Sequence, residues 1–98
     1  MVYRILYTEE SLEDLRAVLD FIRADNPEAA DRFGVALLNH VELLSEFPRL
    51  GAPVSGRDKF RKLLHVPIRV YYRLNEGKRQ IEILHFWHAA RRPPRPRE

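Results

Sequence analysis

The segment Asp25-Asn26-Pro27-Glu28 constrains the fold more than any other part of this 98-residue chain. Asn26 can act as a helix N-cap, and Pro27 suits the first position of a helix, where its missing N–H costs no hydrogen bond. Glu28 then lies in the first turn, where its charge interacts favourably with the helix dipole. Apolar stripes with helical spacing flank this segment on both sides. Because the link is so short, the two helices are predicted to pack as an antiparallel hairpin.

Each predicted helix carries one apolar stripe. The first helix, which Thr8 can cap, has apolar residues at spacings of three and four, namely Leu12, Leu15, Leu19 and Ile22. The second helix is predicted to end near Phe47-Pro48 and to enter the core through Phe33, Leu37, Val41 and Leu44. A short run of strand-forming residues, from Val2 to Tyr7, precedes both helices and predicts a first strand.

The rest of the chain has the pattern of strands. Two prolines and two glycines between residues 48 and 56 predict a loop, and strands are then predicted at 60–66, 68–74 and from 80 to 87 or 88. Pro67 lies near the first turn of this meander. The second turn is Asn75-Glu76-Gly77-Lys78, in which Gly77 is expected to supply a positive φ.

These elements, in the order β-α-α-β-β-β, predict an α+β fold. A helical hairpin would pack on one face of a small antiparallel sheet, in two layers. Residues 1–92 are expected to form a single domain, followed by a mobile tail rich in proline and arginine at 93–98.

Composition limits the class of protein. Hydrophobic residues make up 45% of the chain and charged residues 32%, which indicates a globular protein, and no apolar run is long enough to span a membrane. The chain has no cysteine, which excludes disulfides and thiolate metal sites and suits the cytoplasm. Its beginning is too short and too soon acidic for a signal peptide.

Charge is distributed unevenly along the chain. Residues 1–56 hold 5 Lys+Arg and 10 Asp+Glu, a net charge of −5, whereas residues 57–98 hold 12 and 4, a net charge of +8. The strand-forming half should therefore present a positive surface that favours a polyanion or an acidic protein partner. A solvated charged face that serves only solubility is the alternative.

The predicted strands place several cations on one sheet face. Arg69 and Arg73 share a face with Tyr71 between them, and Arg61 is expected to align on the neighbouring strand. Such a face suits a phosphate or an acidic partner, although it is also what the solvent side of a half-buried sheet would look like. His88 is a better candidate than His85, because it lies at the end of its strand, where a side chain can reach solvent.

No metal site is predicted. The chain has four histidines but no pair of carboxylates at ligand spacing, which is a poor ligand set for a metal ion. The histidines are His40, His65, His85 and His88. The sequence likewise implies no cofactor.

Six short pieces of this chain, taken together, resemble a known family. They are Leu12-Glu13-Asp14-Leu15, Asp25-Asn26-Pro27-Glu28-Ala29-Ala30, Phe47-Pro48-Arg49-Leu50-Gly51, Arg61-Lys62-Leu63, Arg69-Val70-Tyr71-Tyr72-Arg73 and Ile83-Leu84-His85-Phe86-Trp87-His88-Ala89-Ala90-Arg91. In this order and spacing, the chain from Val2 to about Arg92 is similar to the RelE/ParE-type toxins of bacterial type II toxin–antitoxin systems. The Asn-Pro link and the His-x-x-Arg ending resemble the ParE branch more closely.

The resemblance implies a small cytoplasmic toxin that a cognate antitoxin wraps and neutralises. ParE-like members inhibit DNA gyrase by binding, without an enzymatic reaction of their own. On this interpretation, the target-binding residues are Arg61, Arg69, Tyr71, Arg73, His88, Arg91 and Arg92. Leu38, Leu43 and Val54 are candidates for contact with an antitoxin helix, with ordinary packing beneath the loop as the alternative.

The same resemblance leaves a second function open. RelE-like members are metal-independent endonucleases that cleave ribosome-bound mRNA, which needs an acid, a base and cations at one phosphate. The residues that would supply them are Arg61, Arg73, His88 and Arg91. After Arg91 this chain continues with Arg92-Pro93-Pro94 and lacks the Tyr that several nuclease members carry there, which favours the gyrase hypothesis. A non-toxic module that only sequesters an antitoxin is the third hypothesis.

Overall fold

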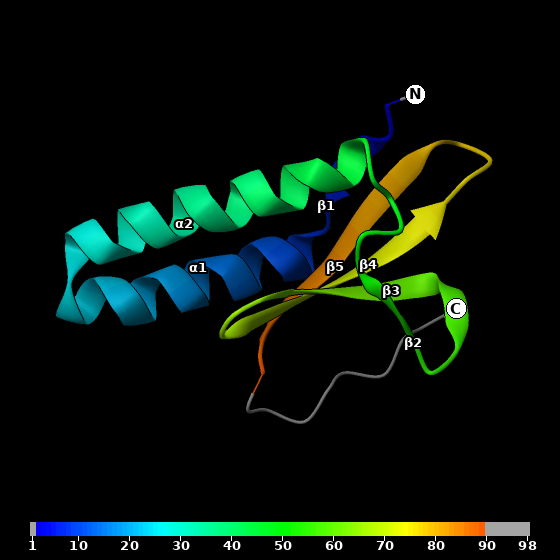
Figure 1. Cartoon of the computed structure of the whole chain (residues 1–98). Helices are drawn as coiled ribbons and strands as arrows, with labels where there is room; N and C mark the ends of the chain where they lie inside the picture. Colours follow the sequence, from blue (N-terminus) through cyan, green and yellow to red (C-terminus); the bar gives the residue numbers. More distant parts are fainter. Residues whose placement is uncertain (1, 90–98) are drawn as a thin grey trace.

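The computed structural model describes residues 2–89 of the chain. It contains two helices, a short 3-10 helix and a five-stranded sheet (Figure 1). In chain order, the elements are β1 (Arg4–Tyr7), α1 (Glu9–Asp25), α2 (Pro27–Glu42), η1 (Leu43–Ser45), β2 (Ala52–Val54), β3 (Arg57–His65), β4 (Ile68–Asn75) and β5 (Gln80–His88). The predicted α+β class is confirmed, while Arg91, Arg92 and the predicted tail at 93–98 lie outside the described residues.

The sheet has the strand order β1-β5-β4-β3-β2. The predicted antiparallel meander is present, with β3 paired to β4 and β4 to β5. Two strands differ from the prediction. β1 pairs with β5 in parallel, so the sheet is mixed. The segment predicted as a loop contains the short strand β2, which pairs with β3 at the sheet edge, where Pro53 is tolerated.

Both helices begin at the predicted caps. The side chain of Thr8 accepts a hydrogen bond from Ser11 N–H, and that of Asn26 accepts one from Ala29 N–H, with Pro27 at the start of α2. Figure 1 shows the two helices side by side on one side of the sheet, with the turn that joins them away from it. The predicted helical hairpin is confirmed. None of the described helices is long and apolar enough to cross a membrane.

The core lies between the helical hairpin and the inner face of the sheet. Leu37, Val41 and Leu44 are buried as predicted, while Phe33 packs partly buried at its margin. The sheet contributes alternate residues of its central strands, Leu63, Ile68, Val70, Tyr72, Leu74, Ile81, Ile83 and Phe86. Leu12, the first residue of the predicted stripe of α1, is 44% exposed, whereas Ser11 is buried and Leu15 packs against the core.

A register shift in β5 decides which side chains face the helices. Tyr71 pairs with His85 and Tyr72 with Ile83, so Leu84 is an extra residue in β5. Phe86 therefore enters the core beside Ile83 although the two are three residues apart. In the hairpin between β4 and β5, the positive φ falls on Arg79 and not on Gly77, which corrects the predicted turn geometry.

Candidate target-binding face

The outer face of the sheet, turned away from the helices, carries the predicted cationic cluster. Arg69 and Arg73 lie on it, half-buried. In register, Arg69 lies between Leu64 and Trp87, Tyr71 between Lys62 and His85, and Arg73 between Phe60 and Glu82. The outer face is defined below by these residues, that is Phe60, Lys62, Leu64, Arg69, Tyr71, Arg73, Glu82, His85 and Trp87. It combines cations, which can bind an anion, with aromatic rings, on which guanidinium groups can stack.

Arg61 does not lie on this face, so its predicted exposure is wrong. Its strand partner is Tyr72, and both side chains point to the inner side, where Arg61 is 7% exposed. Its guanidinium donates to Gly51 O at 2.7 Å, to Arg49 O at 3.3 Å and to Asp58 O at 2.9 Å, and it pairs with the Asp58 carboxylate. The side chain is therefore occupied by internal bonds that hold the loop before β2.

The same loop is held from a second direction. The Tyr72 hydroxyl donates to Pro48 O at 2.8 Å and accepts from Gly51 N–H at 3.0 Å. A Cβ on residue 51 would lie 2.5 Å from Lys62 O, so only Gly51 lets the loop approach β3 this closely. The segment Phe47-Pro48-Arg49-Leu50-Gly51, which carries part of the family resemblance, thus has a structural role at Pro48 and Gly51.

Charges outside the loop complete this network. Arg49 lies between two carboxylates, at 3.1 Å from Asp58 and 2.8 Å from Glu76. Hydrogen bonds from Arg49 and then Arg61 hold the pKa of Asp58 below its ordinary value, while bonds to Asp58 and Glu76 raise the pKa of Arg49. Arg49 and Asp58 are therefore charged throughout the physiological range.

Tyr71 is on the outer face as predicted, but it is 5% exposed. It lies on the central strand with Lys62 on one side and His85 on the other, and flanking side chains limit its contact with solvent. The predicted exposure of Tyr71 is therefore wrong. The ring can support the neighbouring cations but offers little surface to a partner.

Arg73 is a half-exposed cation of the outer face with a carboxylate beside it. Its side chain is 39% exposed, and its Nε lies 3.3 Å from Glu82 Oε1. Next to it is a hollow of about 420 Å³ lined by Arg57, Asp58, Lys59, Phe60 and Arg73. The Arg57 guanidinium lies over the Phe60 ring, 5.8 Å from its centroid.

Sequence analysis missed Arg57 and Lys59 because it began the strand at Phe60. In the structure β3 begins at Arg57, three residues earlier. The signal that could have found them is the cluster of charges directly before the apolar run, which often extends a strand at a sheet edge. With Lys62, these residues add three cations along β3.

The two candidate histidines of β5 have different surroundings. His85 Nδ1 lies 2.9 Å from a carboxylate oxygen of Asp14 on α1, and the same oxygen accepts from Phe86 N–H at 3.3 Å. Asp14 thus covers the edge of β5 beyond the end of β1, and it holds the His85 ring in place. His88 is exposed at the end of β5, as predicted, but its partner in register is Ile68, so it lies on the inner side of the sheet and not on the outer face with Arg69 and Arg73. Arg91 and Arg92, predicted on the same surface, lie outside the described residues.

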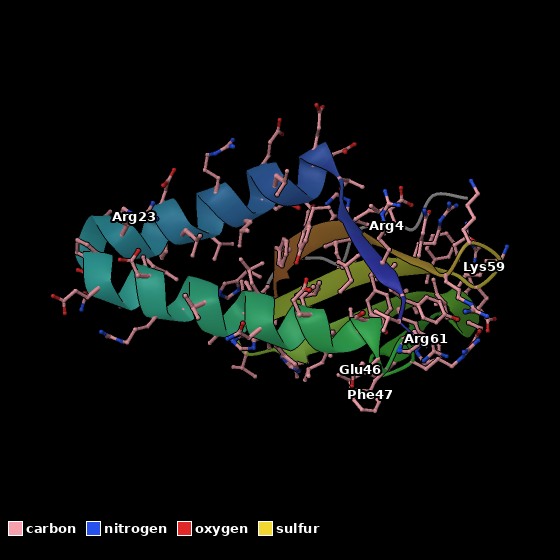
Figure 2. The ribbon with its side chains drawn as sticks, turned by 90° about the horizontal axis from the view of Figure 1, so that it is seen from above. Arg4, Arg23, Glu46, Phe47, Lys59 and Arg61 are labelled. Atoms are coloured by element: carbon pink, nitrogen blue, oxygen red, sulfur yellow. The ribbon has the colours of Figure 1, made fainter. Side chains whose placement is uncertain are left out.

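The three candidates for antitoxin contact are not equivalent. Leu38 packs against the core, and Val54 is partly buried on β2, whereas Leu43 is 47% exposed. Leu43 begins the turn that leads to Phe47, whose N–H donates to Leu43 O at 2.9 Å and which is 56% exposed. Figure 2 shows Glu46 and Phe47 projecting from the surface at this end of the helical layer. Leu43, Phe47 and Leu50, all exposed, are defined below as the apolar corner.

The chemistry of the outer face favours binding. Cations can hold a phosphate or a carboxylate, but an acid–base reaction also needs an available base next to the cations. Among the described histidines, His85 is paired with Asp14, His40 and His65 contact each other on the helix-facing side, and His88 pairs in register with the inward-facing Ile68. No group of three or more His, Asp or Glu suitable for a metal ion occurs among residues 2–89.

Comparison with known proteins agrees with this fold. A family model described as the ParE toxin of the type II toxin–antitoxin system parDE matches residues 5–93. The protein Y4kP of Sinorhizobium fredii, named as a toxin, is 33% identical over 94 residues, which cover 93% of each chain. Toxin RelE2 of Caulobacter vibrioides is 32% identical over 89 residues, 90% of this chain and 97% of that protein.

A solved structure gives the same result. The chromosomal ParDE toxin–antitoxin system from P. aeruginosa includes a chain with a TM-score of 0.74 and 25% identity to this one, covering 89% of this chain and 96% of that chain. Residues 5–93, which the family model matches, include both helices, β2 to β5 and all of β1 except Arg4. The chain therefore belongs to the ParE toxin family of type II toxin–antitoxin systems, within the RelE/ParE superfamily.

Proposed function

We propose that this toxin inhibits DNA gyrase by binding and that a cognate antitoxin neutralises it. The observation that carries the proposal is the match of residues 5–93 to the ParE toxin family, whose members the sequence resemblance associates with gyrase. The ParDE toxin–antitoxin system from P. aeruginosa includes a chain that is similar to most of this one. The family match covers residues 5–93, and the structural match covers 89% of the chain.

The side-chain geometry supports binding over catalysis. Arg61, which a nuclease mechanism would use at a phosphate, is buried and bonded to three backbone carbonyls and Asp58. Arg73 forms an ion pair with Glu82. What remains accessible is a cationic surface around Arg69 and Arg73, which suits an acidic protein partner or DNA held by that partner.

A supercoiling assay with purified gyrase tests the proposal. The toxin should inhibit supercoiling and trap a cleavage complex, and the double variant Arg69→Ala/Arg73→Ala should lower inhibition at least tenfold. Arg23→Ala is the matched control, because Arg23 is an exposed, ion-paired arginine at the helical end opposite Lys59 (Figure 2). Unimpaired supercoiling at a large excess of folded toxin would contradict the proposal.

The apolar corner is the part of the surface that we assign to the antitoxin. An exposed Leu43 beside exposed Phe47 and Leu50 is unusual for a solvated surface, and helix-in-groove recognition uses such anchors. Leu38 and Val54 lie deeper and would support the contact. Leu43→Asp should weaken antitoxin binding in a pull-down with the neighbouring gene product. Phe21→Asp is the matched control, because Phe21 is 84% exposed on α1, far from this corner.

A metal-independent mRNA endonuclease of the RelE type is the second candidate. The observation that favours it is the 32% identity to toxin RelE2, together with the hollow beside Arg73. It predicts cleavage of translated mRNA in induced cells that persists with a chelator and is lost in Arg73→Ala or His88→Ala. Intact transcripts during growth arrest would exclude it. Normal growth on induction of the chain alone would favour a non-toxic module that sequesters an antitoxin.

A further inference from the structure

Two histidines that are 25 residues apart in sequence meet at the junction of helix and sheet. His40 lies in the last turn of α2 and His65 is the last residue of β3. Their Nδ1 atoms are 2.9 Å apart, and their ring centroids are 5.1 Å apart with the planes inclined by 55°. Both residues are partly exposed, so solvent reaches the pair.

Among the described residues, no acidic side chain competes for this pair. No carboxylate of residues 2–89 forms an ion pair with either ring, in contrast to His85, which has Asp14. The edge of the Phe33 ring contacts His65, with centroids 5.5 Å apart and an interplanar angle of 73°. Burial, and then the nearby His40 ring, lowers the pKa of His65.

The separation of the two nitrogens matches that of two ligands on one metal ion. Histidine nitrogens lie about 2.0–2.1 Å from a bound Zn²⁺, so two of them are roughly 2.9 Å apart at a right angle and about 3.3 Å apart at a tetrahedral angle. The observed 2.9 Å lies at the lower end of this range. Small rotations of two partly exposed rings cover the rest.

We propose that His40 and His65 form a two-histidine site for a late first-row divalent ion, of which Cu²⁺, Ni²⁺ and Zn²⁺ are the class. Imidazole suits these ions, and water completes the coordination, because no third ligand from residues 2–89 joins the pair. In the ion-free state one ring donates its Nδ1–H to the other Nδ1. On binding, that proton moves through solvent to Nε2, so both Nδ1 atoms coordinate and no net proton is released.

An ion bound at this site would link the helical layer to the sheet. α2 and β3 belong to the helical layer and the sheet, and an ion bound to both requires the folded arrangement. Binding to the native state alone stabilises it by mass action. The site lies on the helix-facing side, apart from the outer face that the proposed function uses, and the inference does not depend on that function.

Metal titration of the untagged full chain at about pH 7.5 tests the inference, since neutral imidazole is the ligand. Isothermal titration should give one ion per chain, with Cu²⁺ bound most tightly, and the ion should raise the unfolding temperature until a chelator is added. Mg²⁺ and Ca²⁺, which prefer oxygen ligands, should have no effect. His40→Ala and His65→Ala should each lower Cu²⁺ affinity at least tenfold, while His88→Ala should retain it.

A spectroscopic readout separates coordination from a folding defect. The electron paramagnetic resonance spectrum of the Cu²⁺ complex should show coupling to two imidazole nitrogens in the wild-type chain, and to one in the milder variant His40→Gln. Cu²⁺ binding of equal strength in wild type, His40→Ala and His65→Ala would overturn the inference, as would no binding at micromolar protein and ion concentrations.

Discussion

Arg61 and Arg73 lie on adjacent strands and differ in almost everything but residue type. Arg61 faces inward beside Tyr72, is 7% exposed and is bonded to carbonyls of the loop before β2. Arg73 faces outward beside Phe60, is half-exposed and has one carboxylate next to it. The alternation of the strands places one guanidinium in the interior and the other at the surface.

A guanidinium has a different energetic cost and a different role in each of these two environments. A buried guanidinium must have all its donors satisfied, and its partners then depend on it in turn. A surface ion pair is screened and contributes little to folding, so its charge remains available to a partner. We therefore expect substitutions on the inner side to change stability and those on the outer face to change binding.

Arg61→Ala should have the largest effect on folding. It leaves Gly51 O and Arg49 O without a donor and removes the side chain that fixes the loop. The free energy of unfolding should fall by about 3 kcal/mol, as is typical when a buried, fully bonded polar group is removed. Chemical denaturation measures it.

Lys62→Ala is the matched control for this change. Lys62 is the next residue of β3, exposed on the opposite face, and its loss should stay within about 0.5 kcal/mol. If both variants unfolded at the same denaturant concentration, the structural role of Arg61 would be wrong.

Tyr72→Phe should have the next largest effect. Tyr72 is fully buried, and its hydroxyl is the partner of both Pro48 O and Gly51 N–H. Removing the hydroxyl keeps the ring in place and leaves two backbone groups unpaired, at a cost of about 2 kcal/mol in the free energy of unfolding. Tyr3→Phe, on a partly buried tyrosine, serves as the comparison in the same denaturation series. An unchanged Tyr72→Phe protein would show that water replaces the hydroxyl.

Arg73→Ala should change stability by less than about 1 kcal/mol, because its pair with Glu82 is half-exposed. Its effect should appear in the target assay, as a loss of gyrase inhibition of several-fold that grows smaller at high salt. Glu82→Gln keeps Arg73 and removes the competing charge, so it should inhibit at least as well as the wild type. Loss of stability in Arg73→Ala comparable to Arg61→Ala would remove the contrast between the two strands.

Sequence reasoning captured the features that depend on local chemistry. The caps at Thr8 and Asn26, the helical hairpin and the meander follow from residue types a few positions apart. It placed Arg61 on the wrong face of the sheet, because the face on which a strand side chain lies depends on the register. The strand pattern alone did not give the pairing of Arg61 with Tyr72. It dismissed the histidines for the same reason, since only the packing of α2 on β3 brings His40 to His65.

The smallest expected effect is the contribution of His65 to the pH dependence of folding. It extends the comparison of Arg61 with Arg73 to a side chain whose charge depends on pH. Burial and His40 lower the pKa of His65 below its ordinary 6.5 in the folded chain, so the unfolded chain binds more protons in that window. Its contribution to stability is present above pH 6.5 and is lost as pH falls through the folded pKa. The free energy of unfolding, measured with a chelator present, should therefore decline on acidification, and less so in His65→Gln. His88→Gln, on an exposed histidine, should keep the wild-type slope, and equal slopes in all three proteins would mean that the His40–His65 contact does not oppose protonation.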